Sequence, residues 1–400
     1  MRKLWEIARL FLKLGTISFG GPAAHIANME TEAVERRRWL SHEQFLDLFA
    51  ATHLIPGPNA VEMANHIGYR RAGLIGSIVA GLCFSLPAVL ITAAFAYSYV
   101  EYGDIPRVKP FLWGIKPVVL AIILCALGRL GRKSLRTWPL GLIGAGVVAA
   151  VFGSRAIFGK SDEVIILVVA SLLGVILLRW MRTGVPPAKN KTAGILAAAT
   201  VAGTPGVAYA SATVVATGTA ACAASASFSL WKLGLFFFKV GAVLYGGGYV
   251  LVAYLEGGLV DQYGWLNAEQ LIDAVAIGQL TPGPMLSTAT FVGYLVDGIP
   301  GAAVATLGIL LPCFLFVAAV NPLIPKLRNS PTASLFLDAV TAASIGLMAS
   351  VTVTLGRATL IDWPAWLIAA VATAVLLRWK VAPAWLVLAG AVAGSLLYSM

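Results

Sequence analysis

The sequence predicts an all-α polytopic membrane protein made of two inverted-topology repeats, each with a helix that is broken or re-entrant at a Pro-Gly-Pro element. Three observations predict this fold. Hydrophobic residues make up 59% of the 400 residues and charged residues 12%, with a mean hydropathy of +0.85, whereas a soluble domain carries roughly a quarter charged residues. The Pro-Gly-Pro element occurs twice, at 56–58 and 282–284. An ordered series of identities links the two halves.

The net charge of +11 comes from basic residues in short connectors between apolar segments, where such residues orient a chain in the lipid bilayer. It therefore does not indicate a nucleic-acid partner. The four cysteines have no paired spacing, so we interpret them as packing residues and expect no disulfide framework, no metal site and no cofactor. The charged N-terminal segment ends in no small-residue cleavage site, so we expect no removable signal peptide.

The first half opens with an apolar but charge-bearing segment at 4–27 and a polar segment at 28–43. The Ser-x-x-Gln spacing of Ser41 and Gln44 predicts a capping box that opens the next helix. Proline removes a backbone donor and glycine permits a sharp turn, so this helix is expected to run to Ile55, break, and resume to about Tyr69. Simpler spans are expected at about 72–100, 108–128, 139–153 and 163–180, the third being short for the roughly 20 residues that a span needs.

The chain divides into two repeats and a linker. Residues 181–192 are polar and rich in proline, and the Ala/Gly/Thr-rich stretch at 193–222 is apolar enough to span once. We expect an N-terminal repeat at 1–180, a linker with a connecting span at 181–227, and a C-terminal repeat at 228–400. The halves match at an offset of 226 residues (282 − 56), and of 225 beyond a one-residue gap. The matching pairs include Trp5/Trp231, Lys13/Lys239, Gly20-Gly21/Gly246-Gly247, Trp39-Leu40/Trp265-Leu266, Asp47/Asp273, Pro56-Gly57-Pro58/Pro282-Gly283-Pro284, Gly68-Tyr69/Gly293-Tyr294 and Gly73/Gly298.

The two repeats are expected to face opposite sides of the membrane. In the first half the loops near Arg36, Arg70 and Arg129 are basic, whereas their counterparts carry acids such as Glu256 and Asp297. Cytoplasmic loops are enriched in lysine and arginine, so the same structural loop would be cytoplasmic in one half and external in the other. An odd number of spans must then separate the copies, and the 193–222 stretch would supply it.

The two broken helices are the first candidate site. The half-helices that begin after Pro58 and Pro284 present unpaired N–H groups and the positive end of the helix dipole, which attract anions. Inside a bilayer a break is tolerated only where it lines a cavity or is buried in protein. Matching breaks in two halves point to a transporter binding site. The glycine runs Gly20-Gly21 and Gly246-Gly247-Gly248 could add donors or could serve helix packing.

Ionisable residues at membrane depth are costly and often functional. Lys13 and Lys239 precede the two glycine runs and could place positive charge beside a bound anion, or could extend to an interface. Asp47 and Asp273 each lie one helix segment before a break. They could pair with a lysine or carry protons, and the residues alone do not distinguish these roles.

One face of the helix after the first break carries Asn59, Glu62 and His66, at positions i, i+3 and i+7. The position matching Glu62 is Thr288, so this acid belongs to one half only. A carboxylate near an anion site is a natural place for a coupling proton, and histidine titrates near neutrality. For His25, His53 and His66, a structural role and a transport role remain open. No zinc-ligand pattern accompanies them.

Several long motifs resemble those of the chromate ion transporter family, in its long two-domain form. The motifs are Phe19-Gly20-Gly21-Pro22 with His25, Trp39-Leu40, Pro56-Gly57-Pro58-Asn59, Ile67-Gly68-Tyr69, Gly246-Gly247-Gly248-Tyr249, Gly278-Gln279, Thr281-Pro282-Gly283-Pro284 and Ala289 through Tyr294. The resemblance covers nearly the whole chain. It implies a multi-pass inner-membrane protein that moves chromate outward and confers chromate resistance, with sulfate, a dianion of similar size and shape, as competitor.

These observations lead to the hypothesis of a secondary transporter for a tetrahedral oxyanion, driven by an ion gradient because no nucleotide-binding loop is present. A sulfate or related oxyanion transporter and an anion channel are the alternatives. An intramembrane enzyme is disfavoured, and the oligomeric state is left open with a homodimer as one candidate. The expected substrate-binding residues are Gly20, Gly21, Gly57, Asn59, Gly246, Gly247, Gln279, Thr281, Gly283, Lys13 and Lys239. The candidates for proton coupling are Glu62, His25, His53, His66, Asp47 and Asp273.

Overall fold

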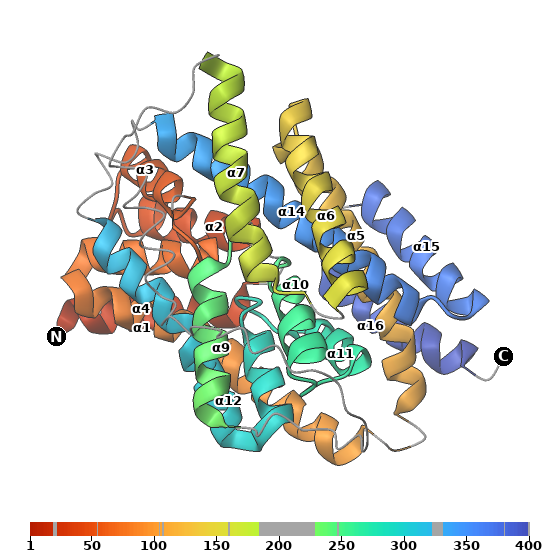
Figure 1. Ribbon diagram of the computed structural model, residues 1–400. Helices are drawn as coiled ribbons and strands as arrows, with labels where there is room; N and C mark the ends of the chain where they lie inside the picture. The colour runs from red at the N-terminus through yellow and green to blue at the C-terminus, as the bar shows by residue number, and fades with distance from the viewer. Residues whose placement is uncertain are drawn as a thin grey trace.

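A computed structural model of the chain describes residues 1–18, 22–53, 55–103, 105, 108–158, 161–183, 229–245, 248–321, 331–379 and 381–398, and these residues form helices and connecting turns without a strand (Figure 1). The predicted all-α membrane architecture is confirmed. The expected connecting span at 193–222 and nearly all of the linker lie outside the described residues. So do four expected ligands, Gly20, Gly21, Gly246 and Gly247.

The first half contains, in chain order, α1 (Arg2–Ile17), α2 (Pro22–Glu30), the π-helical turn η1 (Thr31–Arg36), α3 (His42–Thr52), α4 (Asn59–Tyr102), α5 (Lys109–Ser134), α6 (Trp138–Phe158) and α7 (Glu163–Thr183). The second half contains α9 (Leu230–Val243), α10 (Leu251–Leu255), the π-helical turn η2 (Glu256–Gln262), α11 (Ala268–Leu280), α12 (Ser287–Val320), α14 (Pro331–Thr359), α15 (Trp363–Arg378) and α16 (Pro383–Leu397). The order of long, short and broken helices is therefore similar in the two halves.

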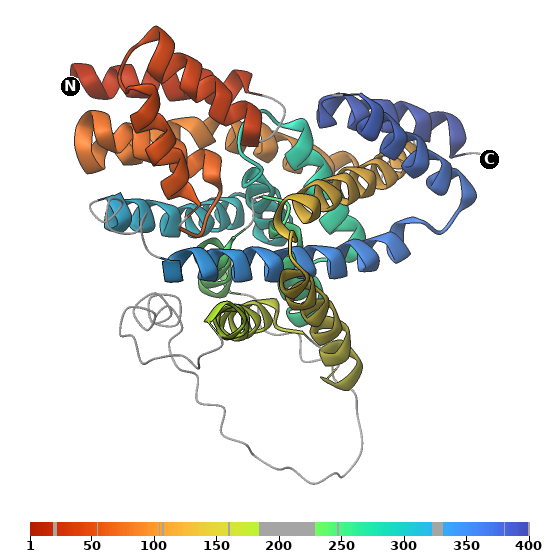
Figure 2. The ribbon, with the colours of Figure 1, turned by 90° about the horizontal axis from the view of Figure 1, so that it is seen from above.

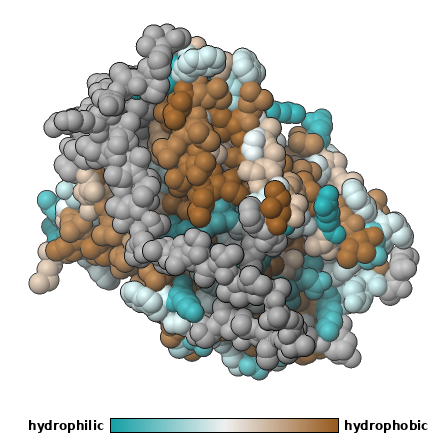
Figure 3. All heavy atoms as spheres, in the orientation of Figure 1, coloured by the Kyte–Doolittle hydropathy of each residue, from teal (hydrophilic) through white to brown (hydrophobic). Residues whose placement is uncertain are grey.

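Six helices among the described residues are long and apolar enough to cross a membrane: α4, α5, α6, α7, α12 and α14. The third simple span, expected at 139–153, is longer than its apolar core suggested, because α6 has a 20-residue apolar helix at Trp138–Ile157. Large apolar side chains gather on the exposed face of α7, which forms much of the hydrophobic surface in Figure 3; they are Ile165, Val169, Leu173, Ile176 and Trp180. Such a face suits lipid contact.

The backbone repeats in the two halves even where the residue type does not. The predicted capping box at Ser41–Gln44 is present, and Asn267–Gln270 forms the same box in the second half. Gly264 has φ +63°, and the matching position, Arg38, has φ +51°. A non-glycine residue with positive φ is uncommon, so this shared conformation reflects the repeated turn and not the side chain.

Each long helix after a break contains a sharp corner. Gly73 of α4 and Gly298 of α12 have φ of +65° and +56° with non-helical ψ, and each ends one helical limb and begins the next. The two limbs fold back so closely that a Cβ on Gly68 would collide with the carbonyl oxygen of Gly76. In an unbroken helix these residues would lie about 12 Å apart along the axis. The break in helical geometry that was expected after Tyr69 is therefore this corner, at Ala72 and Gly73.

The halves pack against each other through their corner helices. In each half the first helix packs on its corner helix, α1 on α4 and α9 on α12, and α4 in turn packs on α12. Figure 2 shows α14 crossing the molecule, with α6 and α7 on one side and α5 on the other, in agreement with the contacts of α14.

Candidate functional site: a cavity between the two helix breaks

The two Pro-Gly-Pro breaks exchange backbone hydrogen bonds with opposite halves. The Gly57 N–H donates to the Leu244 carbonyl at 2.8 Å, and the Gly283 N–H donates to the Ser18 carbonyl at 3.0 Å. Ser18 and Leu244 are separated by 226 residues (244 − 18), as are Gly57 and Gly283. The exchange is therefore reciprocal, as a two-fold relation between the halves requires. Ser18 directly follows α1, and Leu244 directly follows α9. In each half, the segment after the first helix therefore binds the break of the other half.

This exchange revises the expected anion seat. The amides of Gly57 and Gly283 are already occupied, so neither glycine can donate its N–H to a ligand. At the start of α12, the amides of Ser287, Thr288 and Ala289 donate to carbonyls of the preceding turn. The start of α4 is similar, because the amides of Val61 and Glu62 donate to the Pro58 carbonyl. In each half only the two residues after the break, Asn59 and Ala60 or Met285 and Leu286, keep the amides that a helix cannot satisfy internally. The two amide-rich helix starts that were expected are thus narrowed to two residues after each break.

A cavity of about 1560 Å³ lies beside both breaks. Its lining includes Gly57 and Asn59 from the first break and Gly283 and Met285 from the second. It also includes His25, which places α2 on its wall. A tetrahedral oxyanion is much smaller than this volume, so the cavity has room for such an anion together with water.

Three basic side chains line the same cavity: Arg129, Lys133 and Arg136, from the end of α5 and the loop that follows. The acids in the lining are Glu30 and Asp338. Sequence reasoning placed Arg129 and its neighbours in a basic loop that orients the chain and did not predict that they line the cavity. The available signal was their concentration at one helix end, but only the fold brings that end to the breaks.

Two expected polar ligands stabilise the second break instead of lining the cavity. The Thr281 hydroxyl donates to the Gly278 carbonyl at 3.2 Å and lies 3.3 Å from the Ser287 hydroxyl. The Gln279 amide donates to the Met285 sulfur at 3.4 Å. Both side chains therefore join the end of α11 to the start of α12. They stabilise the break whose residues Gly283 and Met285 line the cavity.

The two equivalent lysines form ion pairs away from the cavity. Lys13 Nζ lies 2.7 Å from Glu32 Oε1, and Lys239 Nζ lies 3.2 Å from Asp162 Oδ2. Neither lysine is in the cavity lining. Their expected role beside a bound anion is not supported by this geometry, because each ammonium is already matched by a carboxylate.

The proton-coupling candidates fall in different environments. His25 and His53 line the cavity; the ring Nε2 of His25 is 3.2 Å from the Ser18 carbonyl oxygen, and its Nδ1 is buried without a partner in the described structure. Asp273 accepts a hydrogen bond of 2.8 Å from Tyr99 of the other half, whereas its equivalent Asp47 is only half-buried. Glu62 and His66 are fully buried.

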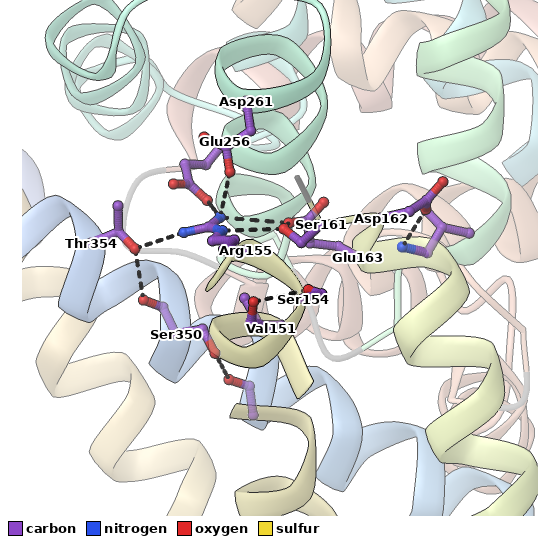
Figure 4. Close-up of polar contacts among 12 residues, drawn as sticks. Val151, Ser154, Arg155, Ser161, Asp162, Glu163, Glu256, Asp261, Ser350 and Thr354 are labelled. Carbon is purple, nitrogen blue, oxygen red and sulfur yellow. Dashed lines mark hydrogen bonds and ion pairs between the residues drawn. The ribbon is translucent and has the colours of Figure 1, made fainter. Parts of the chain in front are cut away.

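A second polar cluster, the Arg155 network, joins the halves far from the cavity (Figure 4). Arg155 of α6 forms ion pairs with Glu256 and Asp261 of η2, the latter at 2.8 Å, and donates to Thr354 of α14 at 3.0 Å. Its guanidinium also lies 3.6 Å from Glu163. These three carboxylates are close enough to hold a metal ion, but Arg155 already supplies the opposite charge.

The position of the Arg155 network within the membrane follows from α6. Trp138, at the start of α6, lines the cavity, and Arg155 is 17 residues further along the same helix. At a rise of 1.5 Å per residue this is about 25 Å, close to the thickness of the hydrocarbon core. The cavity and the Arg155 network therefore lie near opposite ends of the spanning helices.

Comparison with known proteins identifies the family of this chain. The model of the chromate transporter family matches residues 5–177 and 231–395, nearly the full chain. The chain belongs to the chromate transporter family. This membership indicates a membrane transporter rather than an enzyme.

Relatives of this transporter extend over most of its length. It is 32% identical to the chromate transport protein of Cupriavidus metallidurans, with 97% of this chain and 91% of the relative aligned. It is 32% identical to the probable chromate transport protein of Synechococcus elongatus, with 94% and 90% aligned. The chromate transport protein of Pseudomonas aeruginosa is 31% identical, with 87% and 80% aligned. No solved structure matches the chain.

Proposed function

We propose that this protein is a secondary transporter that exports chromate across the inner membrane and confers chromate resistance. The observation that carries the proposal is the cavity of about 1560 Å³ that both helix breaks share with three basic side chains, in a chain of the chromate transporter family. Three cationic and two acidic side chains give the lining a net positive charge, which favours an oxyanion over a cation. Sulfate, with similar shape and charge, is the expected competitor.

The anion is proposed to sit between Asn59 and Arg129. Asn59 offers its side-chain amide and the free N–H of a helix start, and the guanidinium of Arg129 offers paired donors with the geometry that oxyanions need. Lys133 and Arg136, further along the same wall, raise the local concentration of anions at the mouth of the cavity. The role first expected for Lys13 and Lys239 passes to these three residues.

Alternating access is proposed to arise from rocking of two inverted halves, at residues 1–180 and 228–400. The reciprocal hydrogen bonds of Gly57 and Gly283 support a two-fold axis between the halves, and the bias of basic loops supports an axis in the membrane plane. By the same bias the cavity, which contains Arg129, Lys133 and Arg136, opens toward the cytoplasm. The Arg155 network would then close the external side. An ion gradient supplies the energy.

The test is uptake of labelled chromate into inside-out vesicles that contain the protein. We expect saturable, gradient-dependent accumulation that sulfate inhibits. Flux that only dissipates a chromate gradient would indicate a channel, and the absence of flux would reject chromate transport. Arg129→Gln should lower uptake by about tenfold or more, the effect of losing one charge-assisted hydrogen bond. Arg132→Gln is the matched control, because Arg132 lies on the same helix but is absent from the cavity lining.

A further inference from the structure

A buried acid lies directly behind the first break. Glu62, in the first turn of α4, is 0% exposed, and neither carboxylate oxygen has a hydrogen-bond partner within the described residues. Its carboxylate lies against Gly57, where an added Cβ would collide with Oε1. An ionised carboxylate without partners is very costly in a medium of low dielectric constant. The site therefore requires either a proton on Glu62 or a bound cation.

The surroundings of Glu62 extend this polar site along α4. Asn65 and His66, on the next turn, are also fully buried, and Asn65 Oδ1 and His66 Nε2 have no partner in the described part of the chain. The Asn65 amide donates to Cys313 Sγ of α12 at 3.3 Å, and His66 Nδ1 is 3.1 Å from Asn321 Oδ1. A row of polar groups thus runs from the break to the end of α12, between the two halves.

Among the residues that the structure describes, the groups that face Glu62 from other elements carry no positive charge. They are Tyr245, from the segment before the second-half glycines, and Cys313 of α12, both of which lie within electrostatic range of Glu62. A sodium ion needs several oxygen ligands, whereas the neighbouring groups include a thiol and an imidazole, which do not suit a hard cation. A single proton neutralises the Glu62 carboxylate and requires no further ligands.

Gly57 connects the site to the cavity. Gly57 contacts the Glu62 carboxylate and also lines the cavity. The matching position in the second half is Thr288, so only one of the two breaks carries an acid. A negative charge on Glu62 would repel an anion across Gly57, since low dielectric strengthens interactions between charges.

We propose that Glu62, with Asn65 and His66 leading to it, is the proton-binding site that couples to anion binding in the cavity. This inference rests on the proposed function and narrows the six sequence candidates to one. By reciprocity, a proton on Glu62 strengthens anion binding, and a bound anion strengthens proton binding. The dianion and one proton then move together as one net negative charge, whose export is favoured by a membrane potential that is negative inside.

The experiment measures chromate binding to the purified protein in detergent across a range of pH. In the wild type, affinity should fall with rising pH once Glu62 loses its proton, by up to tenfold per pH unit where one proton is linked to one anion. Glu62→Gln has no ionisable group at this position. Its affinity for chromate should therefore lack the fall with rising pH that the wild type shows. Thr288→Val, the equivalent position in the other half, should keep the wild-type pH profile.

Two further measurements make the outcome decisive. In vesicles, wild-type chromate flux should move protons and respond to a pH gradient, and Glu62→Gln should retain chromate flux without proton movement. If Glu62→Gln does not fold, Glu62→Asp should shift the midpoint of the pH profile. An unchanged midpoint, proton movement retained in Glu62→Gln, or dependence on a sodium gradient in place of a pH gradient would each overturn the proposal. Absence of chromate binding by the wild type would instead reject the proposed function.

Discussion

The Gly57 amide and the Leu244 carbonyl are joined by a 2.8 Å hydrogen bond that links the break of one half to the unwound segment of the other. Its counterpart from Gly283 to Ser18 is 3.0 Å long. Because each bond crosses between the halves, a relative rotation of the halves must strain or exchange both of them. The breaks thus hold the two halves together and also form walls of the cavity.

Replacing either break glycine with alanine should impair both folding and transport. Gly57 and Gly283 have φ of +147° and +95°, which alanine reaches only at a cost of about 1–3 kcal/mol. At Gly283 the new Cβ would also lie 3.0 Å from Ala88 Cβ. Thermal unfolding in detergent and chromate uptake measure the two effects.

The matched control for the glycine variants is Gly264→Asn. Gly264 also has positive φ, at +63°, but it faces open space, and asparagine tolerates the left-handed conformation. Arg38 already occupies the equivalent position in the first half with φ +51°. If Gly264→Asn were as damaging as Gly283→Ala, a turn in open space would be as sensitive as the break, and the close contact at the break would not explain the loss.

Much of the fold could be predicted from this sequence because its determinants are local. The capping box at Ser41, the helix breaks and most span positions follow from short patterns of proline, glycine and apolar residues. The repeat was visible because one offset relates so many pairs. The corner at Gly73 was placed a few residues early, since arginines on the preceding turn resembled the end of a helix.

The site was harder to predict because its contacts cross between halves. Lys13 and Lys239 are equivalent in sequence, but Lys13 pairs with Glu32 of its own half and Lys239 with Asp162 of the other. The occupation of the Gly57 amide depends on Leu244, 187 residues away (244 − 57). No spacing pattern in a single sequence contains that information, and the same is true of the approach of Arg129 to the breaks.

Removing the guanidinium of Arg155 should destabilise the transporter strongly. Arg155 faces three acids, of which Glu163 and Glu256 are buried. Breaking a buried ion pair by removing one partner typically costs about 3–5 kcal/mol, because the remaining charge is left unpaired. Arg155→Gln should therefore lower the unfolding temperature in detergent, whereas Arg357→Gln, at an exposed position near the end of α14, should not. Equal effects of the two variants would contradict the importance of the network.

Acid should weaken the ion cluster that Glu32 forms with Lys13, Arg36 and Arg37 in the first half. The hydrogen bond from Lys13, with Arg36 and Arg37 alongside, holds the pKa of Glu32 below its ordinary value of 4.5. A depressed folded-state pKa gives stability that is present above the ordinary value and is lost as the pH falls through the lower folded-state value. Unfolding temperatures measured as a function of pH should therefore decline more below pH 4.5 in the wild type than in Glu32→Gln. Parallel declines would exclude Glu32 as a contributor.

Alanine substitutions of two helical glycines, Gly293 in α12 and Gly146 in α6, should have opposite effects on the unfolding temperature. At Gly293 an added Cβ would collide with the carbonyl oxygen of Gly301 on the returning limb, and a backbone carbonyl cannot move aside without opening the corner. At Gly146 of α6 nothing lies within 4 Å of an added Cβ, and alanine is favoured over glycine in a helix by about 1 kcal/mol. Gly293→Ala should therefore lower the unfolding temperature and chromate uptake, while Gly146→Ala should preserve or raise the unfolding temperature. A tolerated Gly293→Ala would mean that the two limbs separate more readily than their contact implies, and the corner could then bend during transport.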